Sequence, residues 1–313
     1  MKNIILCGII ITLFAGTGGC TFLKVNIGGD IEPLTEKVVS GEGREKVLLL
    51  DVSGVIASGE PGPSFSERKK PGLIARVREA LDRARRDKAV KAVVLRINSP
   101  GGGVTASDVL YHELKKFKQE TGVKIVAHIM DVGASGAYYA ALAADAITAQ
   151  PTSVTGSIGV IMYRVDVTGL MQKVGVQTVE IASAEKKGIG SPFKPLSADE
   201  RKIFQDIIDS LYGRFTGLVA EERKMTPDAV KKMADGRIFT SAEAKAGGLI
   251  DSIGYLEDAI ELAKKQANLS QAEVVTYFRP GEYKANIYSL SLINLDFGDL
   301  ADPGAKFLYL WWP

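Results

Sequence analysis

The sequence predicts an α/β fold in which parallel strands alternate with helices. Three short apolar segments rich in branched residues have the pattern of buried strands: 47–52, 90–97 and 123–130. Between them, apolar residues recur at helical spacing in two intervals, which begin at Leu73 and at Leu110. A unit of strand and helix about every thirty residues favours parallel pairing with crossover helices.

Helices dominate the prediction for the second half of the chain. Residues 197–224 predict a long helix, because Ser197 and Glu200 form a capping box and apolar residues then follow on one side. Its apolar face is wide enough to pack both on the sheet and on a neighbouring subunit. Shorter helices are expected over 227–234, 241–246 and 255–266, and strands over 178–181 and 273–278. The final residues lose the pattern and end in an aromatic tail, 307–313, which would dock on its own body or on a partner.

The composition describes an ordinary globular protein. The 313 residues are 46% hydrophobic and 24% charged, enough for a substantial core, and we find no internal repeat. Because 39 basic residues nearly balance 37 acidic ones without long runs of either sign, we expect no nucleic-acid partner. The only cysteines are Cys7 and Cys20, which excludes a disulfide framework or a cysteine metal site in the body. We expect neither a metal nor a cofactor.

The N-terminus has the order of an export signal. Lys2 precedes the apolar run 4–14, which small residues and then Cys20 follow. Small residues before a cysteine resemble the lipobox of bacterial lipoproteins, although Thr17 stands where an aliphatic residue is usual. We therefore expect a signal peptide over 1–19, lipid attachment at Cys20, and a linker up to residue 46. A conventionally cleaved signal, an uncleaved anchor, or an incidental Cys20 are the alternatives. Lipid attachment, a conventionally cleaved signal and an uncleaved anchor would each place the body outside the cytoplasm.

Three junctions rich in glycine and serine follow predicted strands, at 98–103, 131–136 and 155–159. Folds of this class place their sites at the carboxyl ends of parallel strands. Main-chain N–H groups of the first junction could bind an oxyanion, or the segment could be a plain turn. In the second, Ser135 precedes a helical run, so it is either a nucleophile, with the Gly136 N–H aimed at the oxyanion, or a helix cap.

A serine nucleophile needs a general base. The sequence has two histidines, and both are better explained structurally: His128 lies within an apolar strand, and His112 lies in a helix beside charged residues. The remaining option is a lysine that burial makes neutral, since desolvation lowers the pKa of an amine. Lys186 and Lys187 lie in the segment 183–192, where glycine and proline interrupt the pattern. They could equally be solvated loop residues.

The three junctions and the lysine segment together resemble a known family. Over 47–278 the chain resembles signal peptide peptidase A, a membrane-bound serine peptidase of the Clp protease/crotonase fold. The resemblance implies repeated ββα units with parallel sheets and a helical C-terminal extension, with a peptidase domain over 47–280 and a tail over 281–313. The motifs that carry it, in order, are 98–102, 134–139, 151–160, Lys187 with 190–192, and 235–240 through 244–251.

The resemblance implies a role for each site residue. Ser135 would attack the peptide carbonyl and Lys187 would accept its proton, while Ser157 would orient the lysine. Gly102 and Gly136 would supply the oxyanion N–H groups. The family usually shows Gly-x-Tyr-Lys-Asp around the lysine, whereas this chain reads Ala-Glu-Lys-Lys-Gly over 184–188. Lys186 is therefore the alternative base, although alignment through 190–192 favours Lys187.

The resemblance also implies substrates and an assembly. The family degrades signal peptide remnants left in the membrane, so we expect these and other unfolded peptides as substrates of a membrane-attached enzyme in the bacterial envelope. A ring- or dome-shaped homo-oligomer, an octamer by resemblance, is implied, and its subunits could build the active site jointly. The alternatives are an envelope scaffold whose catalytic pair has decayed around 184–188, and a crotonase-like acyl-CoA enzyme, which export argues against.

Overall fold

The structure is a computed structural model, and it describes residues 32–59, 71–280, 284–289 and 306–311. The expected signal peptide and Cys20 lie outside the described residues. Within the described ranges, no helix combines the length and the apolar character that crossing a bilayer requires.

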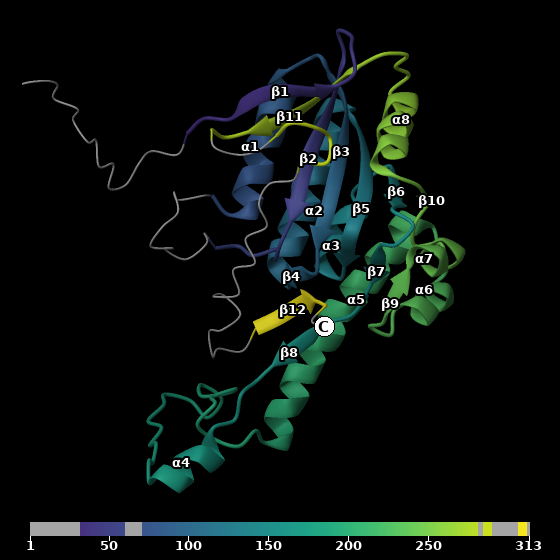
Figure 1. Cartoon of the computed structure of the whole chain (residues 1–313). Helices are drawn as coiled ribbons and strands as arrows, with labels where there is room; N and C mark the ends of the chain where they lie inside the picture. Colours follow the sequence, from purple (N-terminus) through teal and green to yellow (C-terminus); the bar gives the residue numbers. More distant parts are fainter. Residues whose placement is uncertain (1–31, 60–70, 281–283, 290–305, 312–313) are drawn as a thin grey trace, which may run out of the picture.

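The centre of the molecule is a large, mainly parallel sheet (Figure 1). Its strands run in the order β1-β11-β2-β3-β5-β6-β10, and β7 continues from β5 to β9. Only the pairs β1–β11 and β7–β9 are antiparallel within this sheet. This arrangement confirms the predicted α/β class. The strands are β1 (Thr35–Ser40), β2 (Lys46–Ser53), β3 (Val90–Ser99), β5 (Lys124–Ala134), β6 (Ala146–Ala149), β7 (Val154–Gly156), β9 (Ile238–Thr240), β10 (Ser252–Ile253) and β11 (Glu273–Phe278).

Helices cover both faces of this sheet. One core lies between the sheet and a layer formed by α1 (Leu73–Arg86), α2 (Val104–Thr121) and α3 (Gly136–Ala141). A second, smaller core lies beneath α8 (Leu256–Gln266) on the opposite face. Because β2, β3 and β5 are covered on both sides, their residues are buried in succession, which explains why they appear as apolar runs without alternation.

A small three-stranded sheet lies below the carboxyl ends of the central strands (Figure 1). It consists of β4 (Gly101–Gly103), β12 (Lys306–Leu310) and β8 (Ile161–Tyr163), and β12 pairs antiparallel with both neighbours. Thus β12 belongs to the C-terminal tail, in which we predicted no element. It pairs with β4, which is part of the glycine-rich junction 98–103, called the glycine loop below. A second strand that we did not predict is β1, which lies within the expected linker and pairs with β11.

The long helix α5 (Ala198–Arg223) connects the body to an outlying segment. The predicted capping box is present, with the Ser197 hydroxyl accepting from the Glu200 N–H. Near its other end, α5 buries Phe215 and Val219 in the main core. Two short helices follow, α6 (Pro227–Met233) and α7 (Ser241–Ala246), both close to the predicted ranges.

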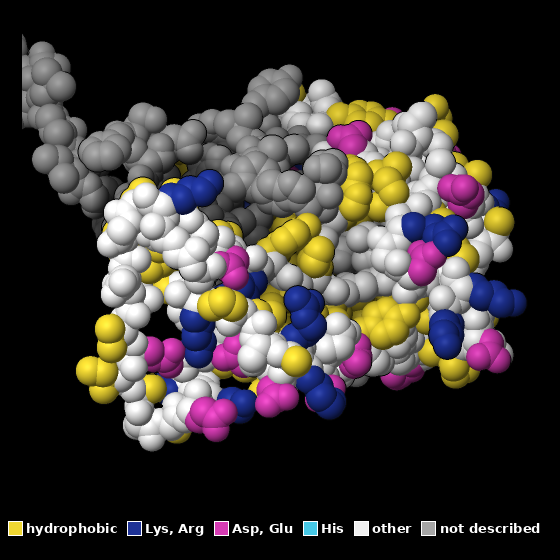
Figure 2. Space-filling view, turned by 90° about the horizontal axis from the view of Figure 1, so that it is seen from below, with side chains coloured by type: hydrophobic (Ala, Val, Ile, Leu, Met, Phe, Trp, Pro, Cys, Tyr) yellow, Lys and Arg dark blue, Asp and Glu magenta, His cyan; other side chains and the backbone are white. Residues whose placement is uncertain are grey.

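Residues 164–197, which we call the arm, extend away from the body and contain one helix, α4 (Thr168–Val174) (Figure 1). The strand predicted over 178–181 is wrong, because these residues form no regular element. Val179 is 86% exposed and Ile181 is 95% exposed, and no strand among the described residues pairs with this segment. Figure 2 views this end of the molecule and shows hydrophobic side chains exposed among charged ones.

Candidate active site

Ser135 occupies the junction between β5 and α3 and has an unusual backbone conformation. Its φ is 54° and its ψ is −116°, a region in which a non-glycine residue is strained by about 1–3 kcal/mol. Two hydrogen bonds hold it there: the Ser135 N–H donates to Gly156 O at 2.8 Å, and the Tyr139 N–H donates to Ser135 O at 2.9 Å. The residue is 1% exposed. The sharp strand-to-helix turn resembles those on which nucleophilic serines are presented.

Ser157 lies beside Ser135 because their strands are neighbours. β5 and β7 are parallel, with Ala134 opposite Gly156, so each serine follows one member of the same pair. Adjacent strands lie about 4.8 Å apart. Ser157 also has a positive φ, of 50°, and its N–H donates to Arg237 O at 2.7 Å. The described residues contain only four non-glycine residues with positive φ, and these two serines are half of them.

The glycine loop brings main-chain donors to the same place. The Ile56 N–H donates to Gly101 O at 2.8 Å, and the Gly103 N–H donates to Ile56 O at 2.9 Å. Since successive peptide groups of a strand point in opposite directions, the N–H and C=O of Gly102 face away from Ile56. A Cβ built on Gly136 would lie 3.2 Å from Gly102 N. The main chains at the two predicted oxyanion residues therefore lie close together, without room between them for a side chain on Gly136.

A cluster of buried aromatic rings, which we call the aromatic pocket, adjoins Ser135. Tyr139 on α3 stacks on Tyr309 of β12 with ring centroids 5.2 Å apart, and Phe215 of α5 lies 4.8 Å from the same Tyr309 ring. The Tyr139 hydroxyl donates to the Asp108 carboxylate at 2.6 Å. Burial raises the pKa of both tyrosines above the usual range, so they stay neutral and act as donors. Sequence reasoning missed this pocket, and the aromatic tail was its only signal.

Lys187 is not brought to Ser135 within one copy of the chain. It lies exposed on the arm, where its main-chain N–H donates to Ala184 O at 3.0 Å. The neighbouring Lys186 has its Nζ 3.9 Å from the Asp199 carboxylate, at the start of α5. From Asp199, α5 rises ~24 Å before it reaches Phe215 beside the aromatic pocket. That distance is far more than a lysine side chain spans.

The two histidines have structural environments. His128 is fully buried on β5, and its Nδ1 lies 2.8 Å from the Thr148 hydroxyl of β6. Burial lowers the pKa of His128 to about 4. His112 is exposed on α2. These positions agree with the interpretation that neither histidine serves Ser135.

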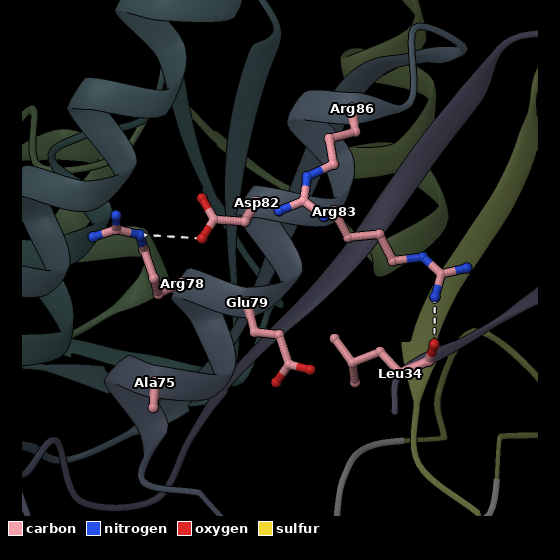
Figure 3. A pocket seen from close by; sticks show the side chains of 7 residues that line it. All are labelled: Leu34, Ala75, Arg78, Glu79, Asp82, Arg83 and Arg86. Atoms are coloured by element: carbon pink, nitrogen blue, oxygen red, sulfur yellow. Dashed lines mark hydrogen bonds and ion pairs between the residues drawn. The ribbon is translucent and has the colours of Figure 1, made fainter. Parts of the chain in front are cut away.

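A separate hollow lies between α1 and the start of β1, away from the glycine loop (Figure 3). Two of its three arginines are engaged by the protein itself: Arg78 pairs with Asp82 and with Glu113, and Arg83 donates to Leu34 O. None of the predicted site residues lines it. The lining residues are Leu34, Ala75, Arg78, Glu79, Asp82, Arg83 and Arg86.

Comparison with known proteins identifies the family of this chain. Residues 117–270 match the model of peptidase family S49. An Enterococcus faecium protein to which the name signal peptide peptidase SppA is provisionally given is 35% identical, over 88% of this chain and 81% of its own length. Arabidopsis thaliana serine protease SPPA is 34% identical over 75% of this chain and 34% of its own.

One longer relative and one solved structure were also found. Protease 4 of Salmonella typhi is 39% identical over 72% of this chain, which covers only 35% of that longer protein. A ClpP1 point mutant of Listeria monocytogenes superposes with a TM-score of 0.43 at 18% identity, over 69% of this chain and 95% of its own. Because the Enterococcus faecium relative is 35% identical and is matched over 81% of its own length, the chain belongs to peptidase family S49 and is a serine peptidase.

Proposed function

We propose that this enzyme degrades signal peptide remnants and other unfolded peptides, with Ser135 as nucleophile and Lys187 of a second copy as general base. The observation that carries the proposal is Ser135 itself, which is buried in a strained turn, beside Ser157, with the main chains of Gly102 and Gly136 in contact next to it. Strained non-glycine residues cluster at active sites, where the surrounding structure holds them.

The chemistry follows from these positions. The Ser135 Oγ attacks the peptide carbonyl carbon, and its proton passes to the uncharged amine of Lys187. The negative charge that develops on the carbonyl oxygen is stabilised by the N–H groups of Gly102 and Gly136, and one such donor is worth about 10²–10³ in rate. The protonated amine then gives its proton to the leaving nitrogen, and water hydrolyses the acyl-enzyme. Ser157 orients the amine by a hydrogen bond.

A second copy is proposed because the apolar side chains of the arm are left exposed in one copy. It exposes large apolar side chains, among them Leu170 at 62% and Ile181 at 95%, in the same segment that carries the exposed Lys187. Packing this segment on a neighbour would bury the apolar side chains and desolvate the lysine, which an amine needs in order to act as a base. The resemblance suggests a closed homo-oligomer, and an octamer is the form that we propose.

The substrate and the location rest on the N-terminal sequence and on the names of relatives. The export signal over 1–19 and lipid attachment at Cys20 would hold the body at the membrane outside the cytoplasm, in the bacterial envelope. Signal peptide remnants are apolar, unfolded and membrane-bound, so they would be presented to such an enzyme. The Enterococcus faecium relative carries a name that states this activity.

Complementation between two inactive variants tests the shared site. Ser135→Ala and Lys187→Ala should each lower the cleavage of an apolar fluorogenic peptide by about 10⁴-fold. Co-expression of the two should restore about a quarter of the sites, because each restored site needs an intact serine from one copy and an intact lysine from the next. Lys186→Ala is the matched control and should keep wild-type activity.

The outcomes separate the alternatives. No recovery in the mixed assembly would contradict a shared site, and loss in Lys186→Ala alone would move the base by one residue. A fluorophosphonate probe that fails to label Ser135 in the assembled wild-type protein would favour the envelope scaffold instead.

A further inference from the structure

The arm keeps its shape without a hydrophobic core of its own. The structure describes the whole of 164–197, and none of these residues is buried in one copy. Figure 1 shows the segment standing apart from the central sheet. Because the burial of apolar surface is the main stabilising contribution in folding, a segment without it must take its shape from hydrogen bonds and ion pairs. The residues that make these bonds therefore decide where Lys187 lies.

Arg164 makes the side-chain bonds that close the arm. It is the first residue after β8, and its side chain is only 11% exposed. Its Nη2 donates to Ser191 O at 2.5 Å and also to Lys194 O, both on the limb of the arm that returns to α5. Its Nη1 donates to the Asp166 carboxylate at 3.2 Å. A single guanidinium thus fastens the returning limb to the end of β8.

The proposed base lies in the segment that these bonds hold. Residues 184–191 form successive turns. The main-chain N–H of Lys187 donates to Ala184 O at 3.0 Å in the first turn, and that of Ser191 donates to Gly188 O at 3.2 Å in the last. The carbonyl of Ser191, which ends this run, is the one that the guanidinium binds. Hydrogen-bonded turns therefore connect the lysine to the end of β8.

We propose that Arg164 is a positioning residue, which fixes the turns around Lys187 to the end of β8 so that the arm offers the amine to the next copy in a preformed geometry. This inference rests on the proposed function, which makes Lys187 the general base. A misplacement of about 1 Å can cost about 10²-fold in rate. A lysine could replace Arg164 only in part, because an ammonium lacks the planar fork that reaches two carbonyls and a carboxylate together.

Steady-state kinetics of Arg164→Ala in the full chain test this. We expect kcat to fall by about 10²-fold and KM to stay within about twofold, because the proposed substrate-binding groups lie in the body rather than on the arm. Arg164→Lys should recover part of the loss. Arg201→Ala is the matched control, since Arg201 is an exposed arginine in the first turn of α5, and it should keep the wild-type kcat.

The double variant with Lys187→Ala separates positioning of the base from a general effect on structure. Once the base is gone nothing is left to position, so Arg164→Ala should not lower the residual rate further in that background. A further fall of similar size, an unchanged kcat in Arg164→Ala with Lys187 intact, or a fall that sedimentation velocity traces to loss of the assembly would each overturn the proposal. Failure of the proposed function would look different, because Lys187→Ala alone would then keep its activity.

Discussion

The body around Ser135 and the arm around Lys187 differ in how their residues are held. Ser135, Ser157 and Gly102 are fixed by main-chain hydrogen bonds and strand pairing inside the body. In the arm, the Val167 N–H donates to Pro192 O at 3.0 Å, a bond between two parts of the arm itself, and large apolar side chains are exposed. The surroundings of the proposed nucleophile are therefore complete in one copy, whereas those of the proposed base would be completed by another molecule.

Among the variants that compare these two regions, the largest effect is expected from adding one methyl group to the body. A Cβ at Gly102 would lie 2.0 Å from Ile56 O, a main-chain atom that cannot rotate away. In Gly102→Ala the strand must shift, and with it an oxyanion donor, so kcat/KM should fall by about 10²-fold or more. Steady-state hydrolysis of a fluorogenic peptide measures this.

The matched control for that prediction lies on the arm. A Cβ at Gly169 would meet no atom within 4 Å, so Gly169→Ala should leave the rate unchanged. If both variants were equally active, the body would tolerate displacement and the contrast between the two regions would be lost.

A smaller effect is expected from a charge on the arm. Ile181 is 95% exposed in one copy, so Ile181→Asp should not change the unfolding temperature of the monomer. It should weaken self-association about tenfold or more if the arm is buried against a second copy, because an unpaired charge is unfavourable in an apolar contact. Sedimentation velocity across a dilution series measures the assembly, and activity should fall in parallel.

Val38→Asp provides the comparison, since Val38 is 45% exposed on β1, on the body rather than the arm. Self-association that Val38→Asp weakens and Ile181→Asp leaves intact would place the contact on the body.

The smallest effect concerns stability in acid. The pKa of buried His128 is lowered to about 4, below the usual value of 6.5. As pH falls below 6.5, the unfolded chain binds a proton that the folded chain refuses, so stability decreases towards pH 4. Between pH 7.5 and 5 this one group should destabilise the protein by about 2 kcal/mol. Urea unfolding should show a smaller loss in His128→Gln, whereas an identical pH dependence in the two proteins would show that His128 titrates normally.

Much of the body could be predicted because its signals are local. The apolar runs of β2, β3 and β5 and the capping box at Ser197 depend on residues close together in the sequence. The junction at Ser135 could be predicted as well, since the carboxyl ends of parallel strands meet at one edge of the sheet. The structure places Ser135, Ser157, Gly102 and Gly136 near one another, and their catalytic roles are proposed from that placement.

The rest depends on contacts that no local pattern encodes. β12 has five residues, and its partners β4 and β8 lie about 200 and about 150 residues earlier in the chain, so its pairing is non-local in the extreme. The segment 178–181 is the opposite case to β12. Its sequence resembles a strand, but it forms none in the part of the chain that the structure describes, since no strand there pairs with it. For Lys187, the proposed partner is another molecule, which no pattern within one chain can reveal.

The helix α5 has a consequence for the size of the proposed assembly. Its 26 residues form a continuous rod ~39 Å long, with the lysine-bearing arm at one end and the wall of the aromatic pocket near the other. In a closed ring in which the lysine of each copy acts in the site of the next, the length of this helix would set the distance between successive catalytic centres. The helix length would then help to determine how many subunits close the circle.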